Sequence, residues 1–170
     1  ASDVYKRQLL TYDEALNPQP GLAERWEVSP DGLRLTFHLR RGVKWHDGVD
    51  FTSADVQYNV MEVWKKVHSR GRITFAPVES VETPDKYTAV LKLAHPSLVI
   101  LSALNAVESQ LLPRHLYEGT DIYKNPHNLA PVGTGPFKFK EWRKGQYIAL
   151  ERNPDYWDSG KPRLCLLYTS

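Results

Sequence analysis

The segment that most constrains the fold is residues 33–40, where apolar and polar side chains alternate one by one. The apolar positions are Leu33, Leu35, Phe37 and Leu39. Alternation of this kind is typical of a β-strand with one buried face. A turn signal, Pro30-Asp31-Gly32, comes just before it, because proline presets φ and glycine accepts a positive φ. We therefore predict a hairpin over residues 24–40, with Trp26 and Val28 on its first strand.

A helix is predicted to follow Thr52 or Ser53, either of which can cap its first turn. Asp55 stands three residues after Thr52, where a capping box places an acidic or amide side chain. Valines then recur with helical spacing on one face, at positions 56, 60, 63 and 67. A stripe of this kind indicates a helix packed on a core rather than a row of ligand contacts.

The rest of the chain mixes hairpins with short helices. A second hairpin is predicted around residues 83–86 and a third around Lys144-Gly145. Short helices are predicted over residues 97–104 and 114–117. This order of elements favours an α+β fold with mostly antiparallel strand pairing.

Composition excludes several classes of function. The 170 residues include 22 basic and 20 acidic side chains, and this near-balance argues against a nucleic-acid or membrane-surface binder. The densest basic cluster, residues 65–72, is interpreted as the solvated end of a helix. The longest apolar run, residues 98–104, is far shorter than the ~20 residues that span a bilayer. The polar N-terminus has no signal-peptide pattern, and the single cysteine, Cys165, cannot form an internal disulfide.

Catalytic and metal-binding motifs are not evident. The six histidines are scattered, without His-x-x-x-His spacing or a cysteine cluster, so neither a metal nor a cofactor is expected. No Gly-x-Ser-x-Gly motif marks a nucleophile. The segment His46-Asp47-Gly48 is interpreted as a turn rather than as the site of a catalytic base. A pair of catalytic carboxylates stays open, because such a pairing is spatial.

Four motifs in a fixed order resemble one protein family. They are PGLAERWEVSPDG at residues 20–32, FHLRRGVKWHDG at 37–48, PVGTGPF at 131–137 and LERNPDYW at 150–157. Together they resemble the family 5 extracellular solute-binding proteins of ABC importers, the peptide, nickel and oligopeptide group. The resemblance implies a periplasmic-binding-protein-like type II lobe.

The same resemblance implies that this lobe is incomplete. Residues 9–164 would form part of the first of two lobes, with the family's extra subdomain at about residues 45–130. The ends, residues 1–8 and 165–170, do not fit the family pattern, and we expect both to be non-native tails. Without the second lobe, we expect the isolated chain to bind solute at about millimolar strength only.

In function, the resemblance implies a monomeric receptor without catalytic activity, located in the periplasm or outside the cell and either free or lipid-anchored. It would capture a solute by closure of two lobes and deliver it to the permease and ATPase subunits of an importer. Peptide is the first choice of solute. Nickel chelates, oligosaccharides, opines and a non-transport peptide sensor stay open, and a hydrolase is the weakest alternative.

Two polar segments are candidates for solute contact. Gly133, Thr134 and Gly135 lie in the family's Gly-Thr-Gly-Pro motif, where a tight turn leading into a strand at Phe137 is the competing structural interpretation. Asn105, Glu108 and Gln110 interrupt an apolar stretch and could face a cleft. Four tryptophans at family positions are interpreted as packing residues: Trp26, Trp45, Trp142 and Trp157.

Overall fold

The computed structural model describes residues 7–105 and 108–169. The chain divides into two compact units. Unit 1 comprises residues 1–7, 42–51 and 112–170, and unit 2 comprises residues 8–41 and 52–111. Every strand pair in the described residues is antiparallel, so the predicted α+β class with antiparallel pairing is confirmed.

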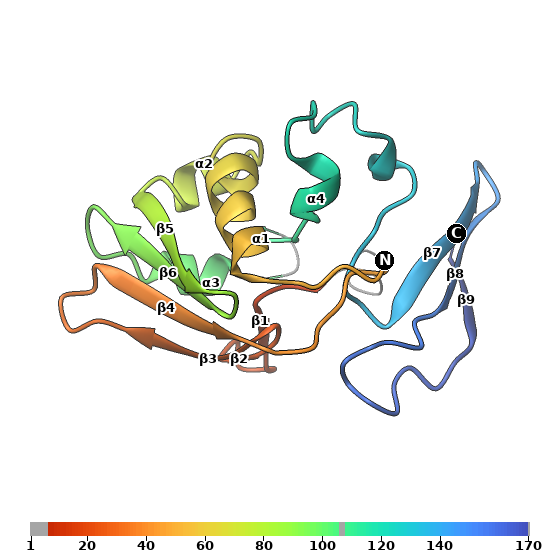
Figure 1. Cartoon of the computed structure of the whole chain (residues 1–170), viewed down its shortest axis with the longest axis horizontal. Coiled ribbons are helices and arrows are strands. Elements are labelled where there is room, and N and C mark those ends of the chain that lie inside the picture. Colours follow the sequence, from red (N-terminus) through yellow and green to blue (C-terminus); the bar gives the residue numbers. More distant parts are fainter. Residues whose placement is uncertain (1–6, 106–107, 170) are drawn as a thin grey trace. The chain divides into compact units, whose positions relative to one another are not determined.

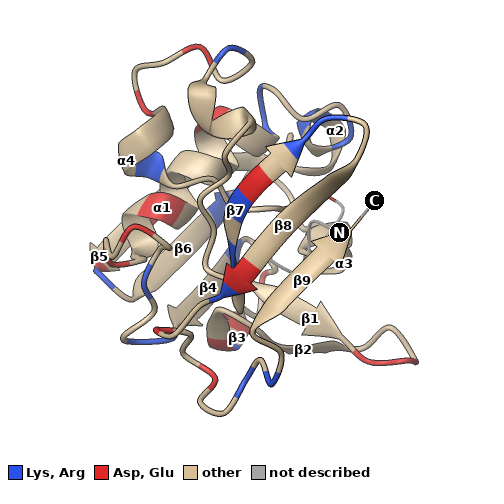
Figure 2. Ribbon diagram, turned by 90° about the vertical axis from the view of Figure 1, so that its right-hand side faces the viewer, with Lys and Arg blue, Asp and Glu red and all other residues tan. Residues whose placement is uncertain are grey.

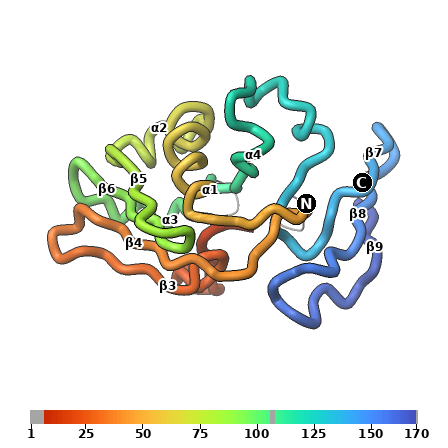
Figure 3. The backbone as a smooth tube through the Cα atoms, in the orientation of Figure 1, coloured from red at the N-terminus to blue at the C-terminus, as the bar shows by residue number. Residues whose placement is uncertain are grey.

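A four-stranded sheet forms the centre of unit 2. Its strand order is β3 (Ala23–Val28), β4 (Arg34–Leu39), β6 (Thr88–Leu93), β5 (Val78–Asp85). The predicted hairpins over residues 24–40 and around residues 83–86 are thus confirmed, and they lie side by side although about 50 positions separate them (Figure 3). Leu35, Phe37 and Leu39 of β4 are buried, as the alternation predicts.

The predicted helix covers this sheet, where α1 (Ser53–Tyr58) contacts β5 and β6 (Figure 1). Its N-terminus carries the expected capping contact, since the Asp55 carboxylate accepts a 2.9 Å hydrogen bond from the Thr52 backbone N–H. After Tyr58 the helix continues as the π-helix η2 (Asn59–Trp64), which the sequence did not predict. Val56, Val60 and Val63 are buried, which confirms that these valines face the core, whereas Val67 lies beyond the end of η2 and is half-buried.

Shorter elements complete unit 2. A two-stranded sheet joins β1 (Leu10–Tyr12) to β2 (Pro18–Pro20), and two short helices are α2 (Gly71–Thr74) and α3 (Val99–Ala103). Because α3 lies within residues 97–104, the helix predicted there is confirmed. Gly21 lies against the backbone before β1, where an added Cβ would come within 2.8 Å of the Gln8 and Leu9 carbonyl oxygens.

Unit 1 contains a three-stranded sheet in the order β7 (Phe137–Arg143), β8 (Tyr147–Arg152), β9 (Leu166–Thr169). The last predicted hairpin, around Lys144-Gly145, is confirmed. Three basic side chains and one glutamate lie along β7: Lys138, Lys140, Arg143 and Glu141 (Figure 2). The predicted short helix is confirmed as α4 (Arg114–Tyr117), and the loop that follows contains one 3₁₀ turn, η3 (Pro126–Asn128).

The tryptophans predicted to pack are not equally buried. Trp45 is buried, and Trp26 and Trp157 are half-buried. The prediction is wrong for Trp142, which is 45% exposed because it lies at the hairpin end of β7, away from the buried residues Phe137 and Leu150. Lys144 lies over its ring, 5.6 Å from the centroid.

Within residues 7–105 and 108–169, no helix is both long and apolar enough to cross a membrane. The predicted subdomain boundaries and the non-native tails stay predictions. Residues 166–169, in the predicted C-terminal tail, form β9 against β8.

Candidate functional site

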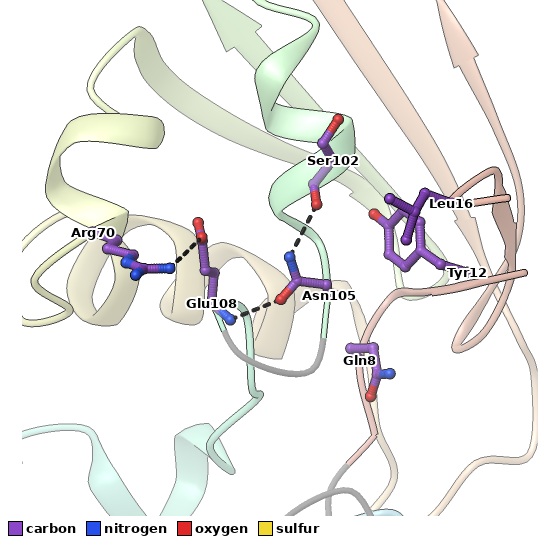
Figure 4. A pocket seen from close by; sticks show the side chains of 7 residues that line it. All are labelled: Gln8, Tyr12, Leu16, Arg70, Ser102, Asn105 and Glu108. Atoms are coloured by element: carbon purple, nitrogen blue, oxygen red, sulfur yellow. Dashed lines mark hydrogen bonds and ion pairs between the residues drawn. The ribbon is translucent and has the colours of Figure 1, made fainter. Parts of the chain in front are cut away.

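Unit 2 contains a cavity of about 530 Å³, which is in the size range of small-molecule sites (Figure 4). Its lining comes from a residue shortly before β1, from β1 and the turn after it, from the residue before α2, from α3, and from two residues that follow α3. The lining residues are Gln8, Tyr12, Leu16, Arg70, Ser102, Asn105 and Glu108. We refer to this site as the cavity.

Asn105 organises the polar side of the cavity. Its side-chain Nδ2 donates a 3.0 Å hydrogen bond to the Ser102 carbonyl oxygen, and its Oδ1 accepts a 3.0 Å bond from the Glu108 backbone N–H (Figure 4). The hydroxyl of buried Ser109 donates to the Asn105 carbonyl oxygen at 2.9 Å. These bonds connect Asn105 to Ser102, Glu108 and Ser109, and so place the Glu108 side chain at the cavity.

The charged groups of the cavity are Arg70 and Glu108. Arg70 Nη1 lies 3.6 Å from Glu108 Oε1, with the arginine side chain 73% exposed and the glutamate side chain 19% exposed. This distance makes an ion pair but is longer than a hydrogen bond. The carboxylate is therefore the more enclosed partner, and the guanidinium is open to solvent.

The apolar side of the cavity is formed by Tyr12 and Leu16. The Tyr12 hydroxyl donates to the Leu101 carbonyl oxygen, and burial raises the pKa of this phenol to about 12, so Tyr12 is neutral at physiological pH. Leu16 is 79% exposed and has φ of +62°, in the left-handed region that β-carbon-bearing residues avoid. The turn that holds it is closed by Asp13, whose carboxylate accepts backbone N–H bonds from Ala15 and Asn17.

The Gly-Thr-Gly-Pro motif lies in unit 1 and is buried. The His46 ring joins its two glycines: Nδ1 accepts a 3.1 Å bond from the Gly133 backbone N–H, and Nε2 donates a 3.0 Å bond to the Gly135 carbonyl oxygen. Asn153 Nδ2 also donates to the Gly135 oxygen, at 3.0 Å. We refer to His46, Gly133, Gly135 and Asn153 as the His46 cluster.

The protonation state of His46 follows from this geometry. Burial lowers the pKa of His46 to about 4, helped by the Lys138 cation and opposed by the hydrogen bond to Gly135. The ring is therefore neutral at pH 7, with its proton on Nε2. The predicted turn at His46-Asp47-Gly48 is confirmed, with Gly48 at φ of +91°. The predicted strand start at Phe137 is confirmed, and residues 134–136 form a bend just before it.

The structure places the sequence-predicted site residues in three environments. Asn105 and Glu108 line the cavity together. Gln110 does not line it, and its backbone carbonyl accepts a 3.1 Å bond from Trp64 Nε1. Gly133, Thr134 and Gly135 are buried in unit 1. The assignment of all six residues to solute contact stays a prediction.

Five cavity residues were not among the predicted binding residues: Gln8, Tyr12, Leu16, Arg70 and Ser102. Gln8, Tyr12 and Leu16 lie within residues 8–16, and Arg70 and Ser102 come from two distant segments, so no motif connects all five. Arg70 falls in the basic cluster interpreted as a solvated helix end, and Gln8 in the predicted N-terminal tail. Among the described residues, no group of three or more histidine, cysteine, aspartate or glutamate side chains could hold a metal ion.

Residues 17–165 match the family described as bacterial extracellular solute-binding proteins, family 5, middle. The chain belongs to this family. Its members are solute-binding proteins rather than enzymes, and the resemblance inferred from the motifs is confirmed.

One similar relative is an ABC transporter peptide-binding protein of Brucella ovis, 39% identical over 167 residues, which cover 95% of this chain and 31% of the relative. Another is the oligopeptide-binding protein AppA of Bacillus subtilis, 37% identical over 158 residues, which cover 89% of this chain and 28% of AppA. The chain therefore spans about a third of the length of the relatives it matches.

Solved structures of the same type confirm the fold. NikZ from Campylobacter jejuni in complex with Ni(L-His) has a TM-score of 0.88 and 32% identity, covering 98% of this chain and 33% of NikZ. B. subtilis AppA in complex with a nonapeptide has a TM-score of 0.85 and 34% identity, covering 98% and 34%. AgaA from A. tumefaciens R10 in complex with agropinic acid has a TM-score of 0.82 and 37% identity, covering 98% and 33%.

Proposed function

We propose that this chain is part of the solute receptor of an ABC importer, which captures peptides outside the cytoplasmic membrane and delivers them to a permease with its ATPases. The receptor acts by binding alone and catalyses no reaction. It works as a monomer, free or lipid-anchored. Family membership and relatives named as peptide-binding proteins support this proposal.

The observation that carries the proposal is the lining of the cavity in unit 2. It combines an apolar side, Tyr12 and Leu16, with amide and charged groups such as Asn105 and Arg70. A peptide presents the same mixture, since each residue offers a side chain beside a backbone that donates and accepts hydrogen bonds. Roomy pockets that hold part of a peptide can use bridging water as well as direct contacts.

A second candidate is a small chelate or opine as the solute. The similarity to NikZ bound to Ni(L-His) and to AgaA bound to agropinic acid favours it, because identity to these two proteins is close to that to AppA. Oligosaccharides and a peptide sensor without a transporter stay open on the family resemblance alone.

Nuclear magnetic resonance can test the proposal at the weak affinity expected. We would titrate the ¹⁵N-labelled 170-residue chain with the tripeptide Ala-Leu-Phe, Ni(L-His), agropinic acid and maltotriose, each to several millimolar. The peptide is expected to shift the amide signals of Tyr12, Asn105 and Glu108. Signals of β7 residues serve as the internal control. If only the nickel complex, the opine or the sugar shifts the cavity signals, peptide import is the wrong function.

A further inference from the structure

We propose that Arg70 is a specificity-determining residue that binds the C-terminal carboxylate of the peptide. This inference rests on the proposed function, and it assigns one end of the solute to one side of the cavity. Three observations support it: the unused donors of Arg70, the position of Glu108, and the apolar surface across from them.

The guanidinium of Arg70 carries more N–H donors than its contact with Glu108 uses. Its ion pair with Glu108, at 3.6 Å, is the one polar contact of this guanidinium within the described part of the chain. An arginine side chain carries five N–H donors in a planar fork that fits the two oxygens of a carboxylate. With 73% of the side chain exposed at the cavity, the fork can receive such a group without first breaking a hydrogen bond.

Glu108 orients Arg70 and also limits what the arginine attracts. The glutamate is held in place by the bond from its backbone N–H to Asn105 Oδ1, and its side chain is mostly covered. Its charge keeps the arginine directed at the cavity (Figure 4). The same charge repels a solute carboxylate, so Glu108 competes with the ligand for Arg70. Removing it should therefore strengthen carboxylate binding.

The surface opposite Arg70 suits the rest of a C-terminal residue. In Figure 4, Tyr12, Leu16 and Gln8 lie across the cavity from Arg70 and Glu108. Leu16 keeps an exposed apolar side chain in a conformation that leucine disfavours, and such outliers cluster at ligand sites. An apolar C-terminal side chain could contact Leu16 and Tyr12 while its carboxylate binds Arg70.

The test compares three peptides by titration of the ¹⁵N-labelled 170-residue chain. They are Ala-Leu-Phe, the same peptide with a C-terminal amide, and Ala-Glu-Phe amide, which carries its carboxylate on a side chain. The signals followed are the Arg70 Nε–H and the amides of Asn105 and Glu108. We expect the free acid to bind about tenfold or more tightly than either amide, because a charge-assisted bidentate contact is lost.

Two variants should change the preference for the free acid in opposite directions. Arg70→Gln should remove the preference for the free acid, whereas Glu108→Gln should increase it. Because both residues line the cavity, the preference is measured within each variant as the ratio of the affinities for the acid and the amide. A residue with a merely structural role would affect the acid and the amide alike. Arg70→Lys should keep part of the preference, since lysine retains the charge but not the fork.

The outcomes separate this inference from the proposed function. If the free acid and the amide shift the cavity signals with equal affinity, peptide binding stands and the role of Arg70 is wrong. If Ala-Glu-Phe amide binds as tightly as the free acid, the assignment to the C-terminus is wrong. If no peptide shifts these signals, the proposed function fails together with the inference.

Discussion

In unit 1, His46 and Asn153 direct their polar atoms at the backbone of residues 133–135, whereas in unit 2 Arg70 and Glu108 direct theirs at a cavity. Both regions combine polar side chains with a turn, and both were candidates for solute contact from the sequence. In the His46 cluster, each ring nitrogen already has a backbone partner. At the cavity, most of the guanidinium faces solvent.

This difference separates stabilising polar groups from binding ones. A buried group whose hydrogen bonds are satisfied within the protein contributes to stability. Removing its partner destabilises the fold, because the group then stays buried without a hydrogen bond and without water. A group with donors open to a cavity contributes little to stability and can exchange water for a solute. Substitutions of the polar groups in the His46 cluster should therefore lower stability, whereas substitutions of those at the cavity should change solute binding with little loss of stability.

The largest expected effect is on stability, from His46→Ala. The substitution leaves the Gly133 N–H and the Gly135 carbonyl without the ring that bonds them, and should lower the free energy of unfolding by about 2–4 kcal/mol. Urea denaturation followed by circular dichroism measures this. The control is His95→Ala at an exposed histidine, expected to stay within about 0.5 kcal/mol. If the two substitutions lower the free energy of unfolding equally, the hydrogen bonds of the His46 cluster do not stabilise the protein as proposed.

Acidification should destabilise the protein through the same ring. The pKa of His46 is about 4 in the folded chain and ~6.5 when unfolded, so the unfolded state takes up a proton first as pH falls. The stability that the neutral ring provides is complete above pH ~6.5 and is lost progressively down to pH ~4. Between pH 7 and pH 5 the loss should be about 2 kcal/mol, seen in urea denaturation at each pH. His46→Gln should show a smaller loss, and an unchanged pH dependence would contradict this assignment.

At the cavity, Leu16→Gly should raise stability rather than lower it. Glycine accepts the φ of +62° that leucine disfavours, and Leu16 is too exposed to lose much burial. We expect a gain of about 0.5 kcal/mol after the entropy cost of glycine, together with weaker peptide binding. Leu16→Ala, which keeps the β-carbon, is the matched control and should weaken binding without the gain in stability. A loss of stability in Leu16→Gly would mean that the leucine packs more than its exposure indicates.

The smallest expected change in stability is that of Arg70→Gln. Because its ion pair is long and the arginine side chain is mostly exposed, the free energy of unfolding should stay within about 0.5 kcal/mol of the original chain. Thermal denaturation monitored by circular dichroism would measure this. A loss well above that value would place Arg70 with the structural groups rather than with the binding groups.

Local patterns were sufficient for most of the fold. The alternation at residues 33–40 predicts β4, the turn signals predict three hairpins, and the valine spacing predicts α1 with its buried face. Each of these depends on residues a few positions apart. The π-helical continuation after Tyr58 and the exposure of Trp142 were not predicted. The first depends on hydrogen bonding within the folded helix, and the second on which side chains pack against that end of the sheet.

The candidate site was only partly predictable. Asn105 and Glu108 stood out as polar residues in an apolar stretch, and both line the cavity. Arg70, Tyr12 and Leu16 gave no such signal, since a cationic residue in a basic cluster and apolar residues near a turn are common on any surface. His46 was correctly interpreted as part of a turn, but its bonds to Gly133 and Gly135 join residues about 90 positions apart.

The sequence by itself determined the family, the class of fold and the positions of three hairpins and three helices, because motifs, turns and periodicity are properties of neighbouring residues. The tertiary structure decided which polar groups are hydrogen-bonded within the protein and which face a cavity. That distinction depends on distances between segments far apart in the chain, such as the 3.0 Å from His46 to Gly135 and the 3.6 Å from Arg70 to Glu108. Hydrogen bonding and burial act over such distances in space, and no spacing along the sequence encodes them.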